Sequence, residues 1–134
     1  MNMLRRLLGV LAGLVAGAIV VALIEGLGHA LWPPPAGADL RDPEQLKALI
    51  PSLPIGALIA VVLGWAMGSF SGGWMAATIS RDFRMALVVG FILLCMGVVT
   101  MVQIPHPLWM WVMGVALPLP AAWFGARLAP KTAS

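Results

Sequence analysis

The sequence predicts an all-α integral membrane protein with four transmembrane helices, and three observations lead to this prediction. Of the 134 residues, 61% are hydrophobic and only 10% are charged, whereas a globular chain carries about a quarter charged residues. The mean hydropathy is +0.99. Four apolar stretches are each long enough to cross a bilayer, which requires roughly 20 helical residues. We therefore expect a single membrane domain over residues 1–134.

The first predicted helix covers residues 7–32 and follows the pair Arg5 and Arg6. Steps of four residues along it place small residues, an acid and an imidazole on one face. The members of this face are Gly9, Gly13, Gly17, Val21, Glu25 and His29. Glycines let another helix backbone approach closely, and an acid is too costly to face acyl chains. We expect this face to contact protein or a water-filled cavity.

A polar connector over residues 33–53 follows, because Pro33, Pro34 and Pro35 cannot continue the helix. Within this predicted outer loop, Asp42 can cap a short amphipathic helix that lies at the membrane interface. An ordered connector is the favoured interpretation of this segment. The alternative is a lid over a cavity.

The second predicted helix covers residues 54–80 and carries a second stripe of the same period, formed by Gly64, Gly68 and Gly72. At about 1.5 Å per residue, the two stripes overlap in depth in the half of the membrane nearer the termini. We expect the first two helices to touch there and to separate further out, where Glu25 and His29 would face a vestibule. In the competing account, one stripe joins two copies of the chain; in either case a homo-oligomer is expected.

The third and fourth helices are predicted over residues 83–104 and 108–128. The fourth contains Pro118 and Pro120 and should be kinked. Basic residues in the flanks then decide the orientation. One side carries six of them and the other side carries Arg41 and Lys47, the six being Arg5, Arg6, Arg81, Arg84, Arg127 and Lys131. This bias predicts a multi-pass protein of a bacterial-type inner membrane with both termini in the cytoplasm.

Glu25 and His29 are the first candidates for chemistry. Residues four apart on a helix can share a hydrogen bond, and two interacting groups titrate together. Such a pair could exchange a proton or respond to a cation near neutral pH, as a proton-driven carrier requires. The competing interpretation is a structural pair that fixes helix packing, and ligand or metal binding is a third.

His106 lies between two prolines on the same predicted outer side, with Gln103 before it and Met110 after it. Together with Glu25 and His29 it could form a His/His/carboxylate metal site, or a His/Met site for copper(I). Two outer histidines could instead hold a haem. Methionines in apolar helices usually fill gaps, however, and loop histidines usually meet water. We therefore predict no firm metal site and no cofactor.

Other functional classes are disfavoured. No nucleophile stands at a recognisable distance from a base, and there is no phosphate-binding glycine loop, so an enzyme is not expected. Cys95 is the single cysteine, which excludes a dithiol site. Scattered basic residues do not suggest nucleic acid. Hydroxyl groups in the helices are expected to bond the carbonyl one turn back, and these belong to Ser69, Ser71, Thr78 and Thr100.

Four helices with an acid in the first resemble the small multidrug exporters, and this likeness covers the topology and Glu25. The tyrosine-rich binding surface of that family has no counterpart, since the chain has no Tyr. Small fluoride channels also have four helices and glycine contacts, but they rely on a pore asparagine and the only asparagine here is Asn2. Neither resemblance identifies a family.

The leading hypothesis is a transporter- or channel-like oligomer with a Glu25–His29 pair facing an outer vestibule and Gln103 and His106 at its rim. The rival hypothesis is an accessory or scaffold protein whose glycine stripes bind a partner membrane protein. A copper- or zinc-binding membrane protein is the remaining alternative.

Overall fold

The computed structural model describes residues 3–39 and 41–131, and all regular structure in this part of the chain is helical. Four stretches are long and apolar enough to cross a membrane: Met3–Leu31, Ile55–Ser80, Phe83–Gln103 and Leu108–Leu128. The prediction of an all-helical chain with four candidate spans is thereby confirmed for the described residues. Residue 40, in the predicted connector, lies outside them.

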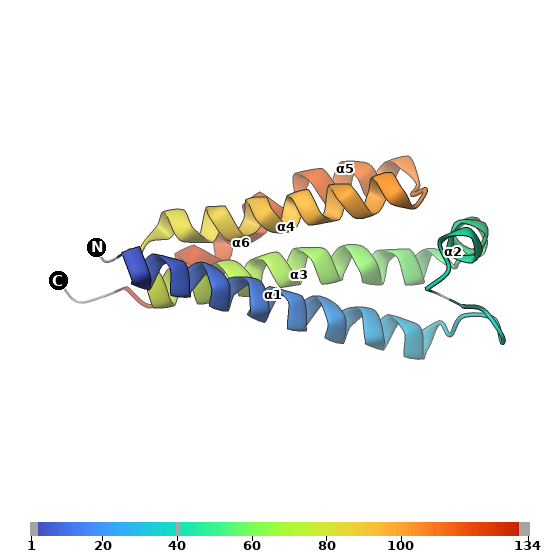
Figure 1. Cartoon of the computed structure of the whole chain (residues 1–134), viewed down its shortest axis with the longest axis horizontal. Helices are drawn as coiled ribbons and strands as arrows, with labels where there is room; N and C mark the ends of the chain where they lie inside the picture. Colours follow the sequence, from blue (N-terminus) through green and yellow to red (C-terminus); the bar gives the residue numbers. More distant parts are fainter. Residues whose placement is uncertain (1–2, 40, 132–134) are drawn as a thin grey trace.

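The elements follow in the order α1 (Met3–Leu31), α2 (Pro43–Leu49), η1 (Ile50–Ser52), α3 (Ile55–Ser80), α4 (Phe83–Gln103), α5 (Leu108–Ala116) and α6 (Pro118–Leu128). The long helices run up and down, so α1 begins and α6 ends at the same end of the bundle (Figure 1). We call this the terminus end. The opposite end, which carries α2 and the α4–α5 turn, is the loop end. Helix α3 is central, because it contacts α1, α4, α5 and α6.

Helices α1 and α3 pack through small residues at the terminus end. A Cβ atom built on Gly13 would lie 2.6 Å from the carbonyl oxygen of Gly72, and one on Gly17 would lie 2.9 Å from that of Gly68. Both glycine stripes therefore face each other within one chain. The contact is looser at Gly64, where a Cβ would find its nearest neighbour at 3.6 Å. It closes again at the loop end, where a Cβ on Gly28 would lie 3.0 Å from Ala60 Cβ, so the predicted separation of the two helices is wrong.

Helix α6 packs on α3 and α4 just as closely. A Cβ on Gly73 would collide with the backbone of Ala122, and a Cβ on Gly125 would collide with the carbonyl oxygen of Phe70. A Cβ on Gly90 of α4 would lie 2.8 Å from the Ala122 side chain. Because only glycine permits these approaches, four helices converge on a tightly packed half-bundle at the terminus end.

The fourth span is divided into two helices at Leu117. Pro118 and Pro120 have no N–H, so the carbonyl groups of Gly114 and Ala116 lose their partners one turn later. Backbone bonds resume on either side of the break, with Leu117 N–H donating to Met113 at 2.9 Å and Ala121 N–H donating to Leu117 at 2.9 Å. The chain changes direction between α5 and α6, which separates the part of the span at the loop end from the part at the terminus end (Figure 1).

Two further boundaries have clear physical causes. Helix α1 begins at Met3, four residues before the predicted start at residue 7. Arg5 is accommodated inside the helix because its Nε donates to the Ile79 carbonyl at 2.8 Å. In the connector, the Asp42 carboxylate accepts a hydrogen bond from Glu44 N–H at 3.0 Å, and Pro43 takes the first helical position of α2.

Candidate functional site

A cavity of about 460 Å³ lies at the loop end of the bundle. Helices α1, α3, α4 and α5 form its sides, and residues of α2 and η1 contribute at the loop end. Its wall is largely apolar. The polar side chains among its lining residues are Glu25, His29, Ser69, Thr100 and His106.

Glu25 and His29 lie one helical turn apart on α1 and both line this cavity. The stem of Glu25 rests on α3, because its Cγ lies 3.7 Å from the position of a Cβ on Gly64. Glu25 is half-buried, whereas His29 is exposed. Within residues 3–39 and 41–131, neither side chain forms a hydrogen bond or an ion pair, so the hydrogen bond that their spacing allows is not made. Both groups remain available to a ligand.

His106 enters the same cavity from the turn between α4 and α5. Its Nδ1 lies 2.6 Å from the Ile104 carbonyl oxygen, to which a protonated Nδ1 donates. The ring is inclined at 49° to that of Trp65, with the centroids 6.1 Å apart. These contacts orient the imidazole and, in its neutral form, leave Nε2 as the hydrogen-bond acceptor.

The remaining predicted site residues, Gln103 and Met110, do not present polar groups to the cavity. Gln103 is exposed and does not line the cavity. Met110 lines it but is fully buried in a cluster with Leu58 and Val62, where its side chain fills space. In the described part of the chain, no three His, Cys, Asp or Glu side chains are close enough to hold a metal ion. The donor set therefore offers no ready metal centre.

Ser69, near the middle of α3, is also among the residues that line the cavity. Ser69 is 1% exposed and its Oγ has no hydrogen-bond partner. The sequence predicts that hydroxyl groups in these helices bond the carbonyl one turn back, and Ser69 does not. Thr78 and Thr100 do, since they donate to the carbonyls of Trp74 and Met96. Between Ser69 and the terminus end, the Gly17–Gly68 and Gly13–Gly72 contacts hold α1 and α3 close together.

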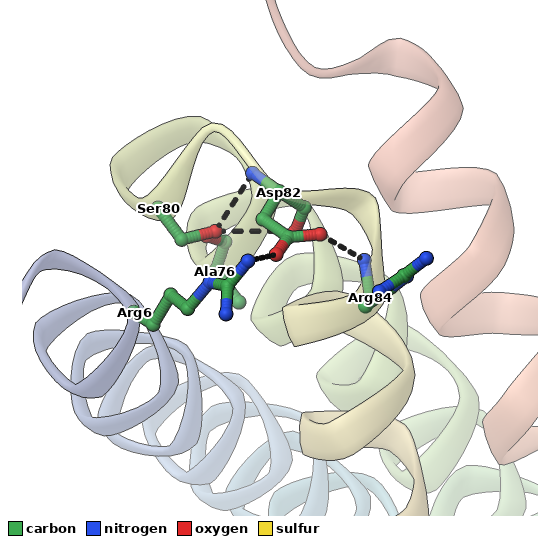
Figure 2. Close-up of polar contacts among 5 residues, drawn as sticks. All are labelled: Arg6, Ala76, Ser80, Asp82 and Arg84. Atoms are coloured by element: carbon green, nitrogen blue, oxygen red, sulfur yellow. Dashed lines mark hydrogen bonds and ion pairs between the residues drawn. The ribbon is translucent and has the colours of Figure 1, made fainter. Parts of the chain in front are cut away.

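A polar cluster joins the helices at the terminus end (Figure 2). Arg6 Nη2 lies 3.0 Å from Asp82 Oδ2, so α1 is tied to the α3–α4 turn. Asp82 Oδ1 also accepts a hydrogen bond from Arg84 N–H at 3.0 Å, which caps α4. Ser80 Oγ donates to the Ala76 carbonyl at 2.6 Å and accepts from Asp82 N–H at 3.1 Å. This cluster was not predicted from the sequence. The signal for it is that Arg6 and Asp82 flank predicted helices on the same side of the membrane.

The chain was compared with protein-family models, with curated proteins and with solved structures. None of the three comparisons gives a match.

Proposed function

We propose that the protein is a small transporter- or channel-like membrane protein whose binding vestibule is the cavity at the loop end. One observation carries the proposal. Glu25 and His29 of α1 line one cavity together with His106, which is distant from them in sequence. Ionisable residues within membrane helices usually mark a path or a binding site for ions or substrates.

In this proposal Glu25 and His29 form the proton- or cation-responsive pair. The carboxylate attracts a proton or a cation into the apolar cavity, and the imidazole one turn away offers a second polar group to the same ligand. His106 lies across the cavity as a third polar contact. Gln103 has no part in the mechanism, because its side chain does not line the cavity.

The proposal includes an orientation, with the loop end outside and both termini in the cytoplasm of a bacterial-type cell. It is supported by the count of basic residues, six near the terminus end against two in the connector. A green fluorescent protein fused after Ser134 should fluoresce, and alkaline phosphatase fused there should be inactive. The reverse pair of results would contradict this orientation.

The rival role, a scaffold that binds partner helices through its glycine stripes, is less well supported. The stripes contact each other inside the chain, so neither presents a free small-residue face to another protein. A homo-oligomer remains part of the transport proposal, but its contacts have to involve other faces. Chemical cross-linking in membranes, followed by mass determination, tests this part.

Flux measurements test the role of Glu25. Proteoliposomes containing a pH-sensitive dye, with a potassium gradient and valinomycin to drive proton entry, should acidify faster than empty liposomes. Glu25→Gln should reduce the rate to that of empty liposomes, since the carboxylate is lost with little change in size. The matched control is Glu44→Gln, which removes an exposed acid from α2 and should leave the rate unchanged. Equal rates for Glu25→Gln and the unmodified protein would contradict the proposed role.

Cysteine labelling tests whether the cavity is filled with water. In a Cys95→Ser background, Gly97→Cys adds a thiol at a lining position where a Cβ meets nothing within 4 Å. Val99→Cys, two residues along α4, adds a thiol to an exposed face that does not line the cavity. A charged thiol reagent should modify the first variant much faster than the second. Two equally unreactive thiols would indicate a dry cavity and favour a structural role.

A further inference from the structure

A second pocket, of about 550 Å³, lies at the terminus end, far from the proposed vestibule. It forms where α3 ends, α4 begins and the chain leaves α6. Three cationic residues line it, namely Arg81, Arg127 and Lys131. Its apolar lining residues are Ala77, Phe83, Ala126, Ala129 and Pro130.

The charge of this pocket is not balanced within the described chain. Asp82 is its only acidic lining residue, and both oxygens of that carboxylate are engaged. One pairs with Arg6 at 3.0 Å, and the other accepts from Arg84 N–H at 3.0 Å (Figure 2). Neither of the ion pairs found in residues 3–39 and 41–131 involves Arg81, Arg127 or Lys131. Three cations around one concave surface therefore attract an anionic ligand.

The surroundings fix the backbone of Arg81 and position the guanidinium of Arg127. Arg81 ends α3 in the left-handed conformation, with φ 56° and ψ 29°, and its N–H donates to the Ala77 carbonyl at 2.9 Å. Glycine takes this backbone conformation without strain, whereas for an arginine it costs conformational energy. The Arg127 guanidinium lies 4.9 Å from the centroid of the Trp123 ring. A stacked guanidinium still presents its N–H edge to a phosphate.

We propose that this pocket binds the phosphodiester headgroup of an anionic phospholipid. Phosphate is the anion that arginine recognises by paired hydrogen bonds, and basic pockets between helix ends suit lipid headgroups. Exposed apolar side chains at the same end of the bundle favour a lipid over a free phosphate, since they offer a path for acyl chains. These are Phe83, Phe124 and Leu128, which are 39%, 56% and 67% exposed.

Native mass spectrometry of the purified full chain tests the proposal, with dioleoylphosphatidylglycerol as the probe. Removing a cation near a lipid surface weakens binding about fivefold, so Arg81→Gln/Lys131→Gln should weaken it roughly 25-fold. The matched control is Arg41→Gln/Lys47→Gln, which removes one arginine and one lysine from the connector at the loop end. This control should bind the lipid as the unmodified protein does.

Further variants and ligands separate lipid binding from a folding defect and from the binding of free phosphate. Arg81→Gly should be at least as stable as the unmodified protein, yet bind the lipid about fivefold less tightly, so a folding defect cannot imitate the result. Dioleoylphosphatidylcholine, which has no net charge, should bind weakly to every variant. Equal losses in both double variants would overturn the proposal. It would also be overturned if millimolar inorganic phosphate displaced the lipid, because the ligand would then be a free phosphate.

Discussion

Gly13 provides the sharpest test of the close contact between α1 and α3. A Cβ at this position would lie 2.6 Å from the Gly72 carbonyl oxygen and 3.0 Å from the side chains of Ala76 and Val89. Carbon and carbonyl oxygen atoms in contact lie about 3.3–3.6 Å apart, so Gly13→Ala has to separate the helices by roughly 0.7–1 Å. Overpacking of this size costs about 1–3 kcal/mol of folding free energy.

Gly26→Ala is the matched control, because a Cβ on Gly26 of the same helix meets nothing within 4 Å. Both substitutions gain about 1 kcal/mol of helix propensity. The difference between their unfolding free energies, about 1–3 kcal/mol with Gly13→Ala the less stable, therefore isolates the contact. Titration with dodecyl sulfate in mixed micelles, followed by tryptophan fluorescence, measures this difference. Equal stability of the two variants would refute the packing argument.

Three further predictions concern the ends of the bundle and the helix break. Asp82→Ala should lower the unfolding free energy by about 1–2 kcal/mol through the lost cap and ion pair; Asp82→Asn should lower it less, and the detergent titration measures both. Pro118→Ala restores a backbone donor, so hydrogen exchange should show a protected amide there, whereas rapid exchange would contradict the cause given for the break. His106→Ala removes the bond to Ile104 and should cost about 1 kcal/mol in the same titration, and an unchanged midpoint would show that the bond contributes nothing.

Much of the architecture could be predicted from the sequence. Long apolar runs and their proline boundaries follow from local chemistry, and the four spans were found at nearly the observed limits. The predicted start of α1 is four residues too late, because two adjacent arginines suggest a boundary just before the apolar stretch. In the structure Arg5 and Arg6 lie within the helix, because Ile79 near the end of α3 supplies an acceptor and Asp82 in the α3–α4 turn supplies a carboxylate.

The contacts of α6 could not be predicted in the same way. Gly73, Gly90 and Gly125 each stand outside a regular period-four stripe of glycines. Their role depends on which helix lies opposite, and that is decided by the packing of the whole bundle. The break at Pro118 turns α6 onto α3 and so brings Ala122 against two of these glycines.

The polar residues that line the cavity also divide into those that could and those that could not be predicted. Glu25 and His29 share a helix face, so their joint position follows from spacing alone. His106 could be assigned to the same end but not to the same cavity, because the direction of a side chain in a turn depends on the local backbone. Gln103 ends α4 on a face that does not line the cavity, and counting residues does not reveal this direction.

The cavity itself follows from where small and bulky side chains stand along α3. At the terminus end, Gly68 and Gly72 allow a neighbouring backbone to approach within contact distance. Toward the loop end, Trp65 packs against His106 and lies close to Gly114 of α5. A bulky ring there holds the α4–α5 turn away from α1, so space opens on the side where Glu25 points. Placing an acid beside that space lowers the cost of its charge, because water or a ligand can reach it.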